Sequence, residues 1–202
     1  MQKEQMLTRR ICFLLLVYTG CAQYVFGQSD YAKHEIGGIF SIFGLDTKGA
    51  FNNDKSRDGF FGFNSQGVHN LSRFWGLKAD LSYSQRQFEA GNSDFTSRLF
   101  QIAGGIKLQD NANATRFRPF AQALIGIAHA SKLPRLLEEN ASGKTVSVLS
   151  GAGLAFGLGG GLDIRLTRKL ELRALQIDYN PVRLKGETFQ NVRLGIGVNF
   201  RF

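Results

Sequence analysis

The segment Val192-Arg-Leu-Gly-Ile-Gly-Val-Asn-Phe-Arg-Phe202 decides the fold of this chain. Every even position is a large apolar residue and every odd position is small or polar, and this period of two predicts a β-strand with one apolar face. Its length matches the roughly 9–11 residues that a tilted strand needs to cross a bilayer. The alternative is an edge strand of a soluble sandwich, but an exposed edge this apolar favours aggregation. We therefore expect a membrane-spanning strand.

Seven further segments of the chain predict strands, and the connections between the eight alternate between long and short. Residues near 174 change the parity of their strand, which predicts a β-bulge at Ala174. An even number of strands with alternating connections indicates an all-β, eight-stranded antiparallel up-and-down transmembrane barrel, with short turns on one side and long loops on the other. The expected strands are 33–45, 59–70, 75–84, 100–108, 119–130, 148–166, 170–179 and 192–202. The expected long loops are 46–58, 87–97, 131–147 and 180–190, and the short turns are 71–73, 109–115 and 167–169. The strongest helical segment, 133–140, is short.

The N-terminus has the pattern of a signal peptide. Three basic residues precede the apolar stretch Ile11–Tyr18, which is too short to span a membrane as a helix. Small residues allow cleavage after Ala22 or after Gly27, and we favour the second. The expected domains are a signal peptide over 1–27 and an outer-membrane barrel over 28–202. The basic residues are Lys3, Arg9 and Arg10.

Both cysteines, Cys12 and Cys21, lie in this leader. The mature chain would then contain no thiol, which fits an oxidising periplasm and excludes disulfides and cysteine-ligated metals. A second interpretation remains open, because the residues before Cys21 resemble a lipoprotein cleavage site that would make this cysteine a lipid anchor. Tyr18 occupies the position where leucine is usual in such a site.

Alternation alone does not say which face of the barrel is outside. A soluble barrel of the lipocalin type also has eight strands but turns its apolar face inward, around a ligand. Here the polar face carries charges of both signs in mid-strand, and a Lys or Arg facing lipid at the midplane costs about 2–4 kcal/mol. We therefore predict an apolar exterior and a lumen that contains salt bridges. The candidate residues are Lys78, Asp80, Asp163, Arg165, Arg173 and Asp178.

Several segments resemble the outer-membrane β-barrel domain family that is similar to the OmpA transmembrane domain. They are Leu158–Arg165, Arg173–Tyr179, Gly197–Phe202, Asn70–Asp80 and Pro119–Gly126. The resemblance covers nearly the whole mature chain. It implies an eight-stranded barrel in the outer membrane of a Gram-negative type bacterium. We expect a monomer whose partners are outer-membrane lipid, lipopolysaccharide and, during insertion, the barrel-assembly machinery. A terminal strand that ends on aromatic residues also implies an assembly signal, here Phe200 and Phe202.

Catalytic and metal-binding patterns are weak. The glycine run 157–161 lies within a strand and lacks the GxxxxGK[ST] pattern of a phosphate-binding loop, so we expect it to serve close packing. The three histidines have no metal-ligand spacing, and we predict no cofactor and no metal. One enzymatic alternative is a lipid A-modifying barrel that uses His129 and Ser131, which would share one face of a strand. Lys132 follows where such enzymes have Asn. The histidines are His34, His69 and His129.

The net charge of +9 comes from scattered Lys and Arg residues, which disfavours nucleic acid as a partner. Cations in the expected loops suit anionic sugars or phosphates of the outer leaflet. An eight-stranded lumen is just filled by side chains, so we expect a structural or surface-interaction role without catalysis, with a narrow porin or transporter as the alternative. The loop cations are Lys48, Lys55, Arg57, Lys132, Arg135 and Lys144.

Overall fold

The computed structural model of the chain describes residues 31–46, 57–90, 93–112, 115–140 and 143–202. The predicted leader with its cysteines, and most of the predicted loop 46–58, lie outside these residues. The strands are β1 (His34–Asp46), β2 (Arg57–Asn70), β3 (Trp75–Ala90), β4 (Ser93–Gln109), β5 (Phe117–Asn140), β6 (Gly143–Arg165), β7 (Leu170–Tyr179), β8 (Val182–Leu184), β9 (Glu187–Phe189) and β10 (Val192–Arg201).

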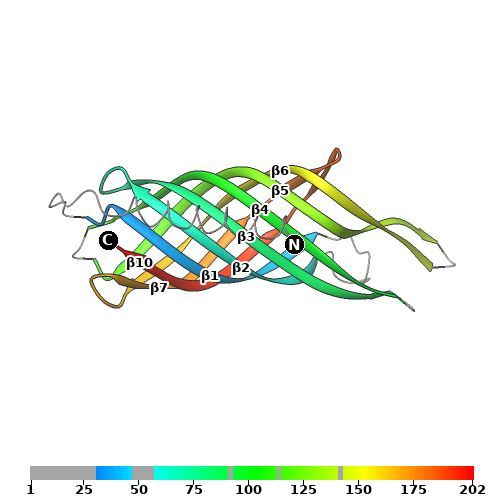
Figure 1. Cartoon of the computed structure of the whole chain (residues 1–202), viewed down its shortest axis with the longest axis horizontal. Helices are drawn as coiled ribbons and strands as arrows, with labels where there is room; N and C mark the ends of the chain where they lie inside the picture. The colour runs from blue at the N-terminus through cyan, green and yellow to red at the C-terminus, as the bar shows by residue number, and fades with distance from the viewer. Residues whose placement is uncertain (1–30, 47–56, 91–92, 113–114, 141–142) are drawn as a thin grey trace, which may run out of the picture.

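The strands form a closed antiparallel barrel (Figure 1). Successive strands pair from β1 to β7, and β10 closes the barrel by pairing with both β7 and β1. The short strands β8 and β9 only extend this sheet, so the wall itself has the eight strands that the sequence predicted. The β2–β3, β4–β5 and β6–β7 turns lie at the same end of the barrel as Phe202, and the long hairpins project from the other end (Figure 1).

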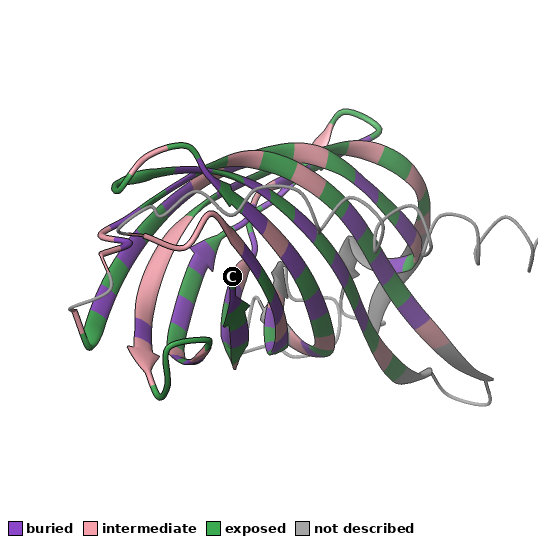
Figure 2. Ribbon diagram, turned by 60° about the vertical axis from the view of Figure 1, so that its left-hand side comes forward, coloured by how far each residue is buried: buried purple, intermediate pink, exposed green. Residues whose placement is uncertain are grey.

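Buried and exposed residues alternate along the strands (Figure 2). In β10, Leu194, Ile196 and Phe200 face outward and are 46%, 58% and 55% exposed, whereas Arg193 and Asn199 face the lumen and are buried. Large apolar side chains cover the outside of the other strands in the same way. The exterior is therefore apolar, and the lipocalin alternative, with its apolar face inward, is wrong. No helix in the part of the chain described here has the length and apolarity to cross a membrane.

The bulge predicted in β7 is confirmed. Asp163 of β6 pairs with Arg173, but the preceding Leu162 pairs with Leu175, so Ala174 has no partner across this ladder. The β10 side of β7 shows a register shift at the same level, between Gly195 and Gly197. The extra residue restores the inward direction of the polar side chains on both sides of the bulge.

Two predicted loops are strands in the structure. β3 and β4 stay paired up to Ala90 and Ser93, and β5 and β6 up to Asn140 and Gly143. The predictions of loops over 87–97 and 131–147, and of a helical segment over 133–140, were therefore wrong. Polar residues do not prevent strand pairing once two strands are already in register. Where both faces of a hairpin contact water, its strands can stay paired without an apolar face.

The predicted loop 180–190 was also wrong, because it contains the β8–β9 hairpin. β8 continues the line of β7 along β6 after a break at Asn180 and Pro181. The two residues between β8 and β9, Lys185 and Gly186, have φ values of 48° and 87°. Two consecutive positive φ angles are typical of the type I′ turn, whose twist matches that of a two-residue hairpin.

Candidate functional site: the filled lumen

The middle of the lumen holds a cluster of four charged residues. The Arg193 guanidinium lies between two carboxylates, with Nη1 3.1 Å from Asp80 Oδ1 and Nη2 2.7 Å from Asp178 Oδ2. Lys78 Nζ is 3.4 Å from Asp80 Oδ2 and also donates to Gln122 Oε1 at 2.7 Å. The sequence predicted Lys78, Asp80 and Asp178 as lumen residues but did not single out Arg193.

Arg173 and Asp163 form the next layer toward the short turns. Arg173 donates from Nε and Nη2 to the two carboxylate oxygens of Asp163, at 2.8 and 2.9 Å. Its Nη1 atom donates to Gln66 and Gln176, and its guanidinium lies 4.2 Å from the ring centroid of Phe120. Asp163 therefore pairs with Arg173, whereas Arg165, the third predicted residue nearby, points toward the base of the barrel.

The base of the lumen contains further ion pairs that the sequence did not single out. Lys107 Nζ lies 2.6 Å from Glu35 Oε2. The Glu171 carboxylate receives Arg118, and Arg201 Nη1 lies 3.2 Å from its Oε1 atom. All five residues are buried. Strand alternation could have found them, because each has the inward parity of its strand.

Three arginines also hold the β4–β5 turn across the base. Arg118, Arg165 and Arg201, from β5, β6 and β10, each donate to a backbone carbonyl of the turn 110–112. Cationic donors on backbone carbonyls fix the position of a turn that lacks its own ladder. The carbonyl acceptors are those of Asp110, Ala112 and Asn111, at 2.8, 2.7 and 2.9 Å respectively.

The same turn is tied to its neighbour on the solvent side. Arg73 of the β2–β3 turn donates to both carboxylate oxygens of Asp110, at 2.8 and 2.9 Å. This hydrogen bonding, with a further hydrogen bond from the Ala112 N–H, lowers the pKa of Asp110 to about 2. The pair therefore stays charged at every pH in which the barrel is expected to work.

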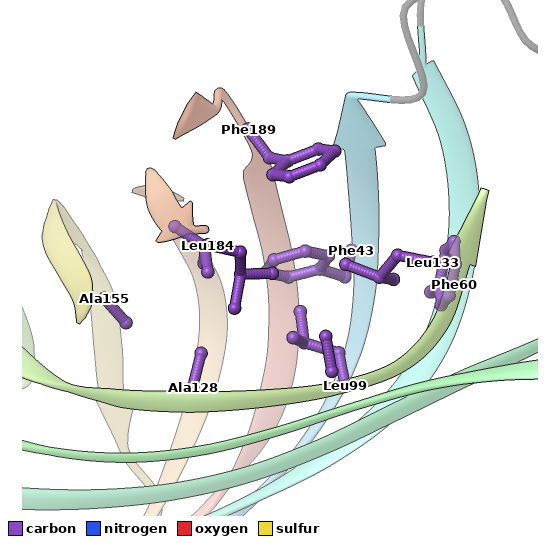
Figure 3. Close-up of a cluster of buried hydrophobic side chains, with 10 residues drawn as sticks. Phe43, Phe60, Leu99, Ala128, Leu133, Ala155, Leu184 and Phe189 are labelled. Carbon is purple, nitrogen blue, oxygen red and sulfur yellow. The ribbon is translucent and has the colours of Figure 1, made fainter. Parts of the chain in front are cut away.

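The end of the lumen on the side of the long hairpins, its outer end, is apolar, which the sequence did not predict. Phe43 and Phe60 face inward from β1 and β2, and residues of five other strands pack with them (Figure 3). The signal was present, since these phenylalanines occupy polar-face positions of their strands. The cluster consists of Phe43, Phe60, Leu99, Ala128, Ala130, Leu133, Ala155, Val182, Leu184 and Phe189, with Leu149 packed against it.

The side chains of the lumen exclude water. Arg173, Asp163 and Glu171 are 0% exposed, and Arg193 is 2% exposed, although all four face the interior of a barrel. An open aqueous channel would leave them in contact with solvent. The described interior is therefore filled, as expected for eight strands.

The residues of the enzymatic alternative lie on the outer wall. His129 is exposed on β5, and its partners in register are Phe100 and Ala152. Ser131 is the cross-strand partner of Arg98. None of these neighbours is a carboxylate that could orient the imidazole. The other two histidines are partners in register near Phe202, with their Nδ1 atoms 3.3 Å apart.

Of the predicted loop cations, the structure describes the side chain of Lys132 alone, which is exposed at a bulge with φ 55°. Arg57, Arg135 and Lys144 belong to the extended ends of β2, β5 and β6. Lys48 and Lys55 lie outside the described residues. Among the residues that are described, no group of three or more metal-ligating side chains occurs.

An apolar outer wall, a closed eight-stranded ladder and a buried polar lumen define a transmembrane β-barrel. The chain belongs to the outer membrane protein beta-barrel domain family, which it matches over residues 13–202. No curated protein matches the chain.

The chain is similar to several solved structures at low sequence identity. Neisserial surface protein A is 12% identical with a TM-score of 0.58, over 86% of this chain and 100% of that one. The N-terminal barrel of Pseudomonas aeruginosa OprF is 14% identical with a TM-score of 0.47, over 85% and 99%. Ail of Yersinia pestis, in complex with the heparin analogue sucrose octasulfate, is 18% identical with a TM-score of 0.48, over 84% and 96%.

Proposed function

We propose that this chain is an integral protein of the outer membrane of a Gram-negative type bacterium, and that its barrel is a non-conducting scaffold with a structural or surface-interaction role. The observation that carries this proposal is the burial of the lumen. The charged layers at Arg193, Arg173 and Glu171 and the apolar cluster at the outer end succeed one another along the barrel, and their side chains are closed to water.

A surface role is supported by the two hairpins that project beyond the band of outward-facing apolar residues on the barrel wall, the apolar belt. The β3–β4 and β5–β6 hairpins continue as paired strands far past the last outward aromatic residues. A paired hairpin presents its side chains in fixed order, which suits recognition better than an irregular loop does. The partners we propose are outer-membrane lipid, lipopolysaccharide and, during insertion, the barrel-assembly machinery, with the protein as a monomer.

Single-channel recording in planar bilayers tests the non-conducting lumen. We expect no stable conductance from the wild-type barrel, after its insertion has been verified by heat-dependent mobility on a denaturing gel. Arg193→Ser removes the guanidinium between Asp80 and Asp178, but the layers at Arg173 and Glu171 and the apolar cluster remain, so we expect this variant to be closed as well. A steady conductance from the folded wild-type barrel would favour the narrow porin instead.

Catalysis is not part of this proposal. His129 has no carboxylate among its partners in register, and a general base in a His–Ser pair normally depends on a third group that orients it. Mass spectra of lipid A from cells with and without the gene should be identical. A mass difference that disappears in the His129→Ala variant would overturn this part of the proposal.

A further inference from the structure

The barrel wall contains a notch between β2 and β3 at the end where the long hairpins project. The last pair that joins these strands is Phe61 with Gln85. Beyond it, β2 continues to Arg57 in register with β1, and β3 continues to Ala90 in register with β4. The two strands therefore separate, and the Arg86 side chain crosses the gap to donate from Nη1 to the backbone carbonyl of Gly59 at 3.1 Å.

A cavity of about 680 Å³ lies at this notch. Among its described lining residues, two are cationic and none is acidic. The exposed side chains on β2, β3 and β4 have outward parity, so the cavity faces the surroundings of the barrel. Besides Gly59, its lining residues are Phe61, Gln85, Arg86, Gln87, Thr96 and Arg98.

The cavity lies where the apolar belt ends. Next to the cavity on the side of the short turns, Phe63, Tyr83 and Phe100 are partners in register and all point outward. Two residues further toward the long hairpins, at the cavity itself, the outward residues of β3 and β4 are Gln85 and Arg98, which are also partners in register. A change from aromatic to polar outward residues marks the membrane–water interface of a barrel.

The polar groups at the cavity are donors. The Gln85 amide oxygen accepts a hydrogen bond from the Tyr83 hydroxyl at 3.0 Å, which leaves its NH₂ group to face a ligand. Arg98 provides a planar fork of N–H groups that matches a phosphate. Thr96 and Gln87 add a hydroxyl and a second amide. The donors and positive charge of these described residues favour an anion with several oxygen atoms.

We infer that this notch binds the phosphorylated headgroup of an outer-leaflet glycolipid. A lipid is favoured over a soluble anion because the apolar Phe61 forms one side of the cavity and the aromatic row lies directly beneath it, where sugar rings and acyl chains of a membrane lipid would pack. The inference rests on the proposed function, in which the long hairpins project on the outer-leaflet side of the membrane. It identifies one site for the lipid partner of the proposed function.

Native mass spectrometry of the folded full chain in detergent tests this site with three probes. They are bisphosphorylated lipid A, the same lipid A after enzymatic removal of its phosphates, and inorganic phosphate. We expect the wild-type barrel to retain the phosphorylated lipid. Arg98→Gln should weaken this binding about tenfold, because it removes one charge-assisted hydrogen-bonding pair. It should leave binding of the dephosphorylated lipid unchanged.

The matched control is Arg168→Gln, which removes an exposed arginine from the β6–β7 turn at the opposite end. It should bind phosphorylated lipid A as the wild type does, and heat-dependent mobility verifies that both variants fold.

The inference is overturned if Arg98→Gln and Arg168→Gln bind equally, or if removal of the phosphates leaves the wild-type affinity unchanged. Displacement of the lipid by millimolar inorganic phosphate would also overturn it, in favour of a soluble anion. A folded, non-conducting barrel that fails to bind lipid A overturns this site and leaves the non-conducting scaffold intact, whereas a conducting barrel that binds lipid A contradicts the non-conducting scaffold alone.

Discussion

Arg173 connects four strands of the barrel through one side chain. It is bidentate to Asp163 of β6, donates to Gln66 of β2 and Gln176 of its own strand, and lies over the ring of Phe120 of β5. Because it is fully buried, its charge depends on these partners rather than on water. A buried ion pair of this kind does not by itself add much stability, but the loss of one partner leaves the other charge without compensation.

Arg173→Met should therefore destabilise the barrel by about 3–5 kcal/mol, since the buried Asp163 would lose its bidentate partner and keep only the Gln109 amide at 3.0 Å and Lys107 Nζ at 3.7 Å. The double variant Arg173→Met/Asp163→Leu should recover most of this loss, because it removes both charges. Urea-induced unfolding of barrels refolded into lipid vesicles measures both values. If the single variant unfolds at the wild-type urea concentration, other groups compensate the charge of Asp163 and Arg173 is not the partner on which it depends.

At this scale, the sequence predicted which residues face the lumen better than it predicted their partners. Lys78, Asp80 and Asp178 share a cluster, but the residue that joins them is Arg193. Asp163 pairs with Arg173, although Arg165 is nearer in sequence. The strand period gives the direction of a side chain, whereas pairing across a lumen depends on the stagger of distant strands, which no local pattern contains.

The glycine run of β6, residues 157–161, contains positions where a neighbouring strand lies too close for a side chain. A Cβ atom on Gly161 would lie 2.0 Å from the carbonyl oxygen of Leu175 and 2.8 Å from Cε1 of Phe120. A Cβ atom on Gly157 would lie 3.4 Å from Cβ of Leu124, an ordinary contact. Only part of the run is therefore required for packing, and nothing in its position resembles a phosphate-binding loop.

Gly161→Ala should lower the free energy of unfolding by about 1–3 kcal/mol, because the neighbouring backbone of β7 would have to move. Gly157→Ala is the matched control from the same run. It should leave stability unchanged or raise it by about 0.4–1 kcal/mol, because alanine restricts the unfolded chain. Thermal or urea unfolding compares the two, and equal losses would show that the run does not differ in its packing as described.

The strands that cross the membrane were predictable, and their extensions were not. Alternation identified the spanning part of β1, β3, β6 and β10 because lipid and lumen select different residues at adjacent positions. Outside the membrane both faces of a hairpin meet water, so the period disappears, and the β5–β6 extension was taken for a loop. The type I′ turn at Lys185 and Gly186 was missed because lysine is not a usual residue for a positive φ.

For the whole molecule, the closure of the barrel depends on the seam between β1 and β10. Their ladder runs from Glu35 with Arg201 to Gly44 with Val192. Phe202 extends it, since its N–H and C=O exchange hydrogen bonds with His34 at 3.0 and 2.8 Å and its ring stacks on that of His34 at 5.7 Å. The last residue of the segment that predicted the fold is thus also a structural part of the seam.

Phe202→Ala separates two roles of this residue, its structural contact in the seam and the assembly signal that the family resemblance implies. It keeps the backbone hydrogen bonds and removes only the ring. The free energy of unfolding of barrels refolded in detergent should therefore fall by no more than about 0.5–1.5 kcal/mol, the contribution of an aromatic pair. In cells, the amount in the outer-membrane fraction should fall much further, because the assembly machinery would no longer meet its terminal aromatic residue. Phe117→Ala is the matched control, since Phe117 is an outward-facing phenylalanine near the same end of the barrel, 58% exposed, and it should keep normal levels in the membrane. If the two variants reach the outer membrane equally well, Phe202 contributes only to the seam and the assembly-signal proposal fails.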